Sequence, residues 1–194
     1  YGSQRLIPLL FTKLKGLEIA HPMLAYYKGL YRNFWLKNQL SSKAARVVLH
    51  ELYKSDIKAL LHKGMGLVLA IDLKLGLRPM DDIDFIVHKQ DAKKAIEIIQ
   101  NLGWQTRFDY PENLDLIHAY SFQNGKGQSI DLHWYTLDTD LTSVHLEGYW
   151  QRSIPAKLEG LPVRVMGVAD QFSPSLAHSA RWSRIPTKRS IADS

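Results

Sequence analysis

The stretch that decides the fold is residues 78–87, which read RPMDDIDFIV. Side chains alternate between the two faces of a β-strand, so we expect Asp82 and Asp84 to point to one face while Ile83 and Phe85 pack on the other. A buried and unpaired carboxylate costs several kcal/mol. Two carboxylates beside a hydrophobic layer therefore indicate a bound cation. Mg²⁺ is the natural candidate, because it prefers oxygen ligands and shares them with substrate phosphates.

A second apolar strand carries a third carboxylate. Residues 129–134 read SIDLHW, and the NGKG at residues 124–127 has the composition of a hairpin turn. The other strand of this hairpin is expected near residues 116–122. If the hairpin pairs beside the acidic strand, Asp131 lies next to the two aspartates described above.

Three carboxylates on one face of a sheet suit phosphoryl or nucleotidyl transfer. Two metal ions about 3.5–4 Å apart can activate an attacking hydroxyl and neutralise the leaving pyrophosphate, while the protein positions their ligands. His133 lies two residues beyond Asp131 on the same strand face. This histidine is predicted either to orient the substrate or a metal-bound carboxylate or to pack in the core, and both roles are favoured over direct metal binding.

A Gly-containing turn that opens a short helix offers backbone N–H groups to phosphates, and Lys63-Gly64 has this form. Lys63 would add a point charge, and Arg78 a planar fork suited to phosphate oxygens. Two structural alternatives stay open. Lys63 can simply mark a turn, and Arg78 can form a salt bridge to one of the acids.

Composition excludes several classes of function. The chain of 194 residues contains no cysteine, which excludes disulfides, thiolate zinc sites and a cysteine nucleophile, and a reducing cytoplasm is predicted. It has no long uncharged apolar run and no signal-peptide pattern at its start, so we expect neither secretion nor membrane insertion. The formal net charge of +6 is dispersed, which favours a solvated basic surface over a nucleic-acid interface. The sequence contains no Gly-x-Ser-x-Gly turn, so nothing in it supports a serine hydrolase.

The periodicity of apolar residues predicts helices and strands in mixed order, and hence a compact α/β (α+β) domain with a small mixed sheet. Asp91 is expected to cap one of the helices and Gly103 to end it. The expected helices cover residues 4–15, 22–53, 67–71, 91–102, 141–150 and 170–181. The expected strands cover residues 57–61, 82–88, 116–122, 129–134 and 161–166, and residues 75–79 form a loop.

Three segments together resemble the uncharacterised nucleotidyltransferase family of the polymerase-beta-like superfamily. These segments read LHKG at residues 61–64, GLRPMDDIDFIV at 76–87 and IDLHW at 130–134. The PLL at residues 8–10 and the HSAR at 178–181 are similar as well, so the resemblance covers nearly the whole chain. Asp-x-Asp alone is a weak signal, but the motifs are specific in combination.

The resemblance implies a fold of the nucleotidyltransferase type with helical additions at both ends. It divides the chain into an N-terminal helical region (1–56), a nucleotidyltransferase core (57–167) and the start of a truncated C-terminal helical region (168–194). It also implies metal ligands and catalytic residues at Asp82, Asp84 and Asp131, and nucleotide binding at Lys63, Gly64 and Arg78.

Two positions depart from the pattern of relatives. The wider superfamily usually has Gly-Ser at the phosphate turn, whereas Met65 follows the glycine here, so a hydroxyl contact to phosphate is absent. Asp81 stands where relatives often have a small residue. It is predicted either to be a solvated neighbour or to crowd the metal site with a further negative charge.

The function predicted first is a nucleotidyltransferase that depends on Mg²⁺ (or Mn²⁺) and moves an NMP group from an NTP, ATP being the expected one. The acceptor would be a hydroxyl or phosphate of a small molecule, protein or RNA, and Asp131 would help to deprotonate or position it. The first alternative is a nucleotide-binding regulatory protein with weak catalysis, supported by the missing hydroxyl. The second is the toxin component of a toxin-antitoxin pair, because such toxins share the Lys-Gly turn, the arginine and the Asp-x-Asp strand.

Overall fold

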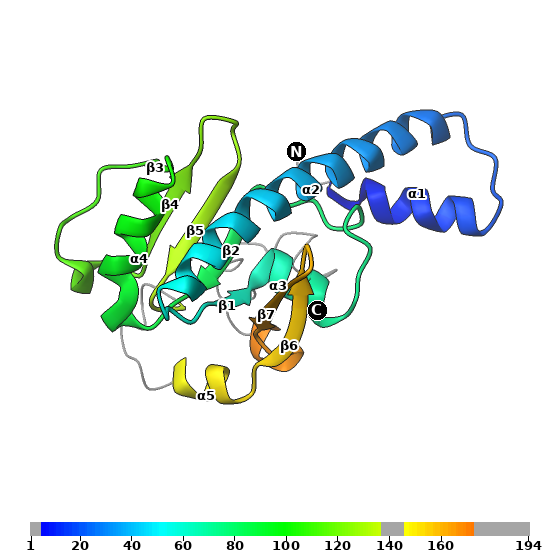
Figure 1. Cartoon of the computed structure of the whole chain (residues 1–194). Coiled ribbons are helices and arrows are strands. Elements are labelled where there is room, and N and C mark those ends of the chain that lie inside the picture. The colour runs from blue at the N-terminus through cyan, green and yellow to red at the C-terminus, as the bar shows by residue number, and fades with distance from the viewer. Residues whose placement is uncertain (1–4, 137–145, 173–194) are drawn as a thin grey trace.

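The computed structural model describes residues 5–136 and 146–172, and within them one seven-stranded mixed sheet is flanked by helices (Figure 1). In sheet order the strands are β3 (Gln105–Thr106), β4 (Ala119–Gln123), β5 (Ser129–His133), β2 (Ile83–Ile86), β1 (Leu60–His62), β7 (Leu161–Val165) and β6 (Ile154–Leu158). The helices are α1 (Ile7–Gly16), α2 (Leu24–Lys54), α3 (Lys63–Ala70), α4 (Lys89–Asn101) and α5 (Leu146–Gln151), with a 3₁₀ turn η2 (Leu114–Leu116). This is the mixed α/β fold that the sequence predicts.

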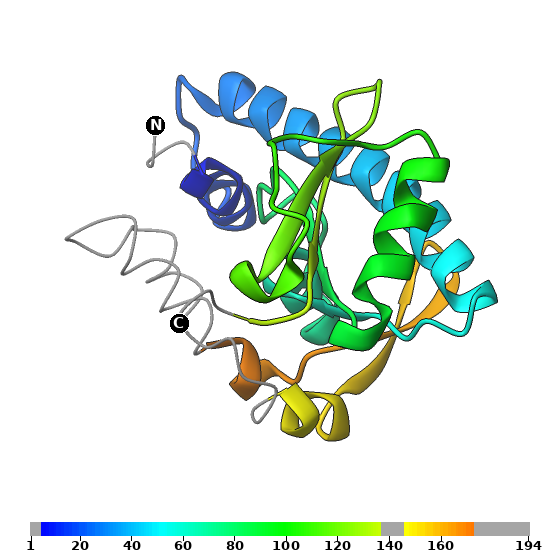
Figure 2. The same cartoon turned by 90° about the vertical axis from the view of Figure 1, so that its left-hand side faces the viewer.

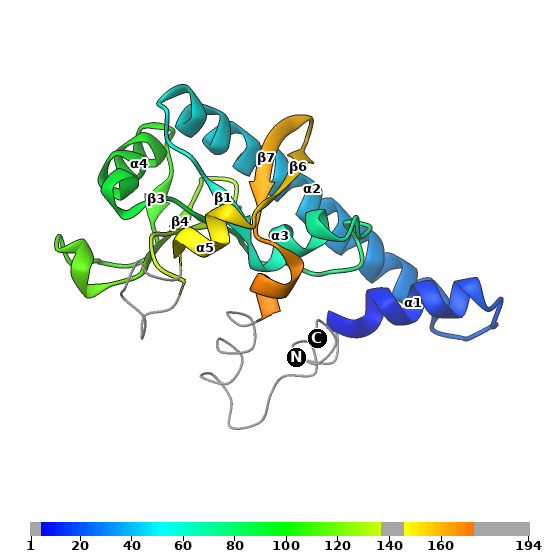
Figure 3. The same cartoon turned by 90° about the horizontal axis from the view of Figure 1, so that it is seen from below.

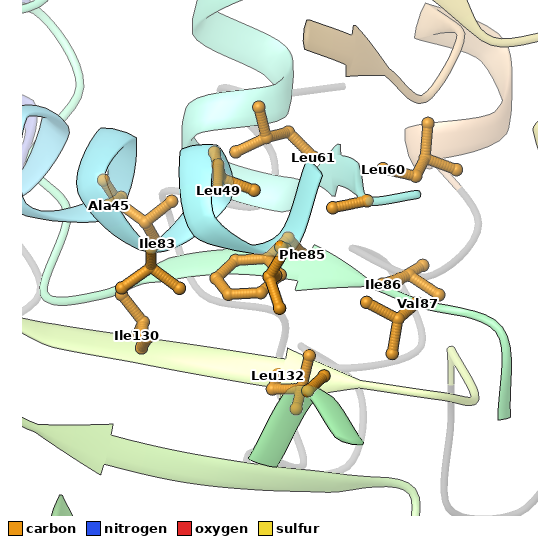
Figure 4. Close-up of a cluster of buried hydrophobic side chains, with 14 of the residues drawn as sticks. Ala45, Leu49, Leu60, Leu61, Ile83, Phe85, Ile86, Val87, Ile130 and Leu132 are labelled. Atoms are coloured by element: carbon orange, nitrogen blue, oxygen red, sulfur yellow. The ribbon is translucent and has the colours of Figure 1, made fainter. Parts of the chain in front are cut away.

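The centre of the sheet combines antiparallel and parallel pairing. Strand β2 runs antiparallel to β1 and parallel to β5. In the β2–β5 register Phe85 pairs with Leu132, and both side chains are fully buried. Figure 4 shows them in the apolar cluster with Ala45 and Leu49 of α2. One face of the central strands is therefore apolar and covered by α2.

Helix α2 covers the sheet because its buried apolar residues recur at three- and four-residue steps, at Ala45, Val48, Leu49 and Leu52. Helix α4 lies beside the C-terminal half of α2 (Figure 2). Helix α1 packs along the N-terminal half of α2, away from the sheet (Figure 3). The ring of Phe11 on α1 meets Tyr31 on α2 at a centroid distance of 5.5 Å.

Several predicted elements are confirmed. Helices α1 and α2 and the β4–β5 hairpin occupy the expected stretches, with Gly127 at a positive φ of 78° in the hairpin turn. Helix α4 ends at Asn101, and Gly103 follows with φ of 84° and donates its N–H to Gln100 O, as expected of a glycine that stops a helix.

Some boundaries were wrong. Strand β1 begins at Leu60 and includes His62, so it ends one residue later than expected, and α3 begins directly after it at Lys63. Strand β2 begins at Ile83, which leaves Asp82 just before it. Helix α4 begins two residues before Asp91, so this aspartate lies in the first turn and is not the cap.

Two strands were missed because their local signals are weak. Strand β3 has only two residues, which is too short for a period-2 pattern. Strand β6 contains Pro155, which weakens the local signal of a strand; β6 is an edge of the sheet, where a proline is tolerated. The expected helix over residues 141–150 is described only from Leu146 onward, and the expected helix over 170–181 only as far as Phe172. The rest of both lies outside the described residues.

Candidate active site

The register of the three central strands places the acidic residues on the sheet face opposite α2. Asp84 on β2 pairs with Asp131 on β5 in the parallel direction and with His62 on β1 in the antiparallel direction. Side chains of directly paired residues lie on the same face, and neighbouring strands are about 4.8 Å apart. The prediction that the hairpin pairs beside the acidic strand is confirmed. Asp82 precedes β2 by one residue and is partly buried.

Lys63 forms a buried ion pair with Asp84. Its Nζ lies 2.6 Å from Asp84 Oδ1, and the two side chains are only 19% and 5% exposed. Lys63 has φ of 48°, in the left-handed region that non-glycine residues seldom adopt. This backbone conformation occurs where β1 turns sharply into α3. The sequence predicted that the lysine would meet phosphate, and in this structure its ammonium group binds a carboxylate.

His133 lies against the same carboxylate. Its Nε2 is 3.0 Å from Asp84 Oδ1 and 3.3 Å from Lys63 Nζ, and the ring is buried. Burial and the neighbouring ammonium lower the pKa of His133 to about 4, so the ring is neutral at pH 7. The structure therefore brings His133 together with the acidic residue that the sequence expected it to orient.

His62 is a component of the site that the sequence analysis missed. It is fully buried, and its ring meets that of His133 edge-on at a centroid distance of 4.7 Å. Among the described residues neither ring nitrogen has a hydrogen-bond partner. Burial lowers the pKa of His62 well below its usual range. Its only sequence signal was its position directly before Lys63, because its proximity to Asp84 comes from strand pairing.

The three aspartates do not titrate alike. Burial, together with the charges of Asp84 and Asp131, raises the pKa of Asp82 to about 7. Burial and the Asp84 charge also raise the pKa of Asp131. Burial opposes ionisation of Asp84 as well, but Lys63 and the His133 hydrogen bond hold its pKa well below the usual range. The site thus contains more buried acid than its own cation neutralises.

The oxygen donors of the three aspartates are of the type that a divalent metal ion binds, although the three do not make up a described group whose ligand atoms all lie within 4.8 Å of one another. Asp131 Oδ1 is buried and, in the part of the chain that the structure describes, accepts no hydrogen bond. The raised pKa values of Asp82 and Asp131 show that a positive charge near them would be favourable. Carboxylate oxygens are the ligands that Mg²⁺ and Mn²⁺ prefer.

Gly64 and Arg78 meet at the start of α3. A Cβ at Gly64 would lie 3.0 Å from Met80 Sδ and 3.5 Å from Arg78 Nη1, so a larger residue here would require the Met80 side chain to shift. The loop is attached to α2 by Asn38, whose Nδ2 donates to Leu75 O at 2.6 Å and to Arg78 O at 2.8 Å. The arginine predicted to bind nucleotide is therefore next to the predicted phosphate turn.

Asp81 does not crowd the acidic cluster. Its side chain is 76% exposed and forms an ion pair with Arg5. Of the two expectations for this residue, the structure supports the solvated neighbour.

The same fold occurs in nucleotidyltransferases. The lincosamide antibiotic adenylyltransferase LnuA, with lincomycin bound, is similar at a TM-score of 0.56 and 14% identity, over 78% of this chain and 92% of that one. ANT(2'')-Ia in complex with adenylyl-2''-tobramycin is similar at a TM-score of 0.57 and 16% identity, over 78% of this chain and 84% of that one. An antigenic nucleotidyltransferase-like protein from Paracoccidioides brasiliensis is similar at a TM-score of 0.51 and 11% identity, over 79% of this chain and 71% of that one. The fold is thus of the nucleotidyltransferase class.

The chain belongs to the uncharacterised nucleotidyltransferase family, whose model matches residues 2–193. The family resemblance seen in the three sequence segments is confirmed. No curated protein matches this chain in sequence. Within the described residues, no helix has both the length and the apolar character needed to cross a membrane.

Proposed function

We propose that this protein transfers an NMP group from an NTP, ATP in particular, to a hydroxyl group of an acceptor and releases pyrophosphate. The observation that carries the proposal is the parallel register of Asp84 with Asp131, which puts the Asp-x-Asp strand and a third carboxylate side by side on a partly polar sheet face. Membership of a nucleotidyltransferase family supports the same reaction class.

Asp82, Asp84 and Asp131 would hold Mg²⁺ or Mn²⁺. When bound, such ions neutralise phosphate charge and acidify the attacking hydroxyl. In the transfer the acceptor oxygen forms a bond to the α-phosphorus, the bond from that phosphorus to pyrophosphate breaks, and the hydroxyl proton goes to a base. Asp131 is the proposed base, because burial and the Asp84 charge raise its pKa and so increase its proton affinity.

The remaining residues would position these groups. His133 holds Asp84 Oδ1 at 3.0 Å and so restricts the rotation of this carboxylate. Arg78 and the backbone N–H groups at the start of α3, where Gly64 lies next to this arginine, are proposed to bind the triphosphate. Lys63 can join them only after it leaves Asp84, to which it is bound in this structure.

Two of the structural neighbours suggest the type of acceptor. LnuA is an adenylyltransferase with lincomycin bound, and ANT(2'')-Ia is in complex with adenylyl-2''-tobramycin. A small molecule with a free hydroxyl is therefore the acceptor that we propose. At 14% and 16% identity these likenesses concern the fold, so they do not select a particular acceptor.

A second candidate function is a nucleotide-binding regulator with weak catalysis. Met65 stands where a serine hydroxyl would contact phosphate, and Lys63 is bound to Asp84. Such a protein would bind nucleotide without turning it over.

The test is incubation of the protein with ATP labelled at the α-phosphate, Mg²⁺ or Mn²⁺ and a panel of hydroxyl-bearing acceptors. Wild type is expected to release pyrophosphate and label an acceptor, whereas Asp84→Asn and Asp131→Asn lose at least a hundredfold in rate. Asp81→Asn is the matched control, since this aspartate is exposed and should leave the rate unchanged. Nucleotide binding without pyrophosphate release, across all metals and acceptors, would favour the regulator. Arrest of growth on expression, relieved by Asp84→Asn, would favour the toxin.

A further inference from the structure

We propose that His62, Asp84 and His133 form a second cation site, which Lys63 fills in this structure and which a first-row transition-metal ion takes in its place. The site shares Asp84 with the proposed transferase centre but has imidazole nitrogens on its other side. It goes beyond the proposed reaction, because metal binding here can be measured whether or not the protein turns over ATP.

The geometry of the donors supports this site. One ligand atom from each of the three residues lies within 4.8 Å of the others, and all three side chains are buried. Metal ions bind imidazole nitrogen and carboxylate oxygen at about 2.0–2.2 Å, which places neighbouring ligands about 3 Å apart. Asp84 Oδ1 and His133 Nε2 already have this separation, at 3.0 Å.

His62 provides independent support. A buried imidazole normally donates one hydrogen bond and accepts another. In the described part of the chain both ring nitrogens of His62 lack a partner, although the ring is fully buried and close to Asp84. A metal ion would satisfy one of these nitrogens, and no group of residues 5–136 or 146–172 does so.

Lys63 already occupies the position of a cation. Its ammonium group touches both Asp84 Oδ1, at 2.6 Å, and His133 Nε2, at 3.3 Å. These are two of the three proposed ligand atoms. Two cations cannot share one carboxylate oxygen at such short range without strong repulsion, so metal binding here requires Lys63 to leave. The lysine is then available to the triphosphate, which would couple metal entry to nucleotide binding.

The donor set selects the type of metal. Two imidazole nitrogens and one carboxylate suit Mn²⁺, Co²⁺ or Zn²⁺, whereas Mg²⁺ prefers oxygen ligands alone. The other group of ligands that includes Asp84, namely Asp84 with Asp82 and Asp131, offers oxygen atoms alone and so suits Mg²⁺.

The experiment is a titration of the nucleotide-free full chain with Co²⁺, read from its visible d–d absorption bands, whose intensity and position report the geometry and donor atoms of the bound ion. Wild type is expected to show these bands, and a tenfold excess of Mg²⁺ should not remove them. Lys63→Met should tighten Co²⁺ binding at least tenfold, because the competing ammonium is gone. His62→Leu should weaken binding at least tenfold and change the spectrum. Lys58→Met, at an exposed lysine before β1, should behave as wild type.

Two outcomes would overturn the proposal: unchanged Co²⁺ affinity in both Lys63→Met and His62→Leu, or displacement of the bands by equimolar Mg²⁺. Circular dichroism checks that each variant is folded, and His62→Gln replaces His62→Leu if the latter fails. The labelled-ATP assay in Mg²⁺ is run separately. Loss of turnover with intact Co²⁺ bands refutes the proposed function alone, and turnover without the bands refutes this inference alone.

Discussion

The buried ion pair between Lys63 and Asp84 permits a quantitative prediction about stability. Exposed ion pairs contribute about 0–1 kcal/mol, but these side chains are only 19% and 5% exposed. Removing one member of a buried pair costs about 3–5 kcal/mol, because the other charge stays buried without its partner. We therefore expect Asp84→Asn to lower the free energy of unfolding by about 3 kcal/mol or more, which corresponds to roughly 6–12 °C in Tm for a chain of this size.

Lys63→Met is expected to be less costly. The carboxylate keeps its hydrogen bond from His133, and loss of the ammonium lets the pKa of this histidine rise. The double variant removes both charges, so its cost should be smaller than the sum of the single costs by about 1–3 kcal/mol. The assay is urea unfolding at pH 7 without metal, followed by tryptophan fluorescence. Single costs below about 1 kcal/mol, or strictly additive costs, would refute this account of the pair.

The remaining predictions concern Asp82, two glycines and Asn38. The pKa of Asp82 is raised to about 7, so its proton must leave before a metal ion binds. The affinity of the wild type for Mn²⁺ should therefore rise by up to about tenfold per pH unit between about pH 6 and 7, and should level off at about pH 8. Titration calorimetry with Mn²⁺ should show that Asp82→Asn binds the ion more weakly and that its affinity depends less on pH. In the metal-free protein the raised pKa means that the folded state holds a proton that the unfolded state releases, so the stability contributed by Asp82 should fall as pH rises from about 4 to above 7. Gly66→Ala should lower the free energy of unfolding by about 1–3 kcal/mol, since its Cβ would lie 2.9 Å from Leu61 O. Gly29→Ala, with open space around it in α2, should raise the free energy of unfolding by up to about 1 kcal/mol in the same urea-unfolding assay. Asn38→Ala removes the two hydrogen bonds that Asn38 Nδ2 donates to the Arg78 loop, and it should lower the free energy of unfolding by about 1–3 kcal/mol. An unchanged free energy of unfolding would show that the loop is held by other contacts.

Much of the fold follows from local sequence patterns. The apolar spacing of α2, the glycine that stops α4 and the turn of the β4–β5 hairpin are each encoded within a few residues, so they could be predicted without tertiary information. The edge strand β6 could not, because whether Pro155 is acceptable depends on the strand having a neighbour on one side only.

Two of the three aspartates, Asp84 on β2 and Asp131 on β5, could be placed on one face of the sheet for the same local reason, whereas Asp82 lies just before β2. Alternation along a strand determines which side chains share a face, and a carboxylate among apolar residues is conspicuous in a sequence. The sequence also showed that Lys63, Arg78 and His133 were candidates. It did not show which partner each would choose.

These partners were decided by the tertiary structure. His62 lies near Asp84 only through the antiparallel register of β1 and β2, and Lys63 meets Asp84 only because a positive φ turns the chain sharply between β1 and α3. Asp81, in contrast, pairs with Arg5 from the distant N-terminus. By itself the sequence determined which residues carry charge and which face of a strand they occupy, since this depends on neighbours along the chain. Which charges neutralise one another depends on strands that pair across long separations, and on the burial that makes an unpaired charge costly.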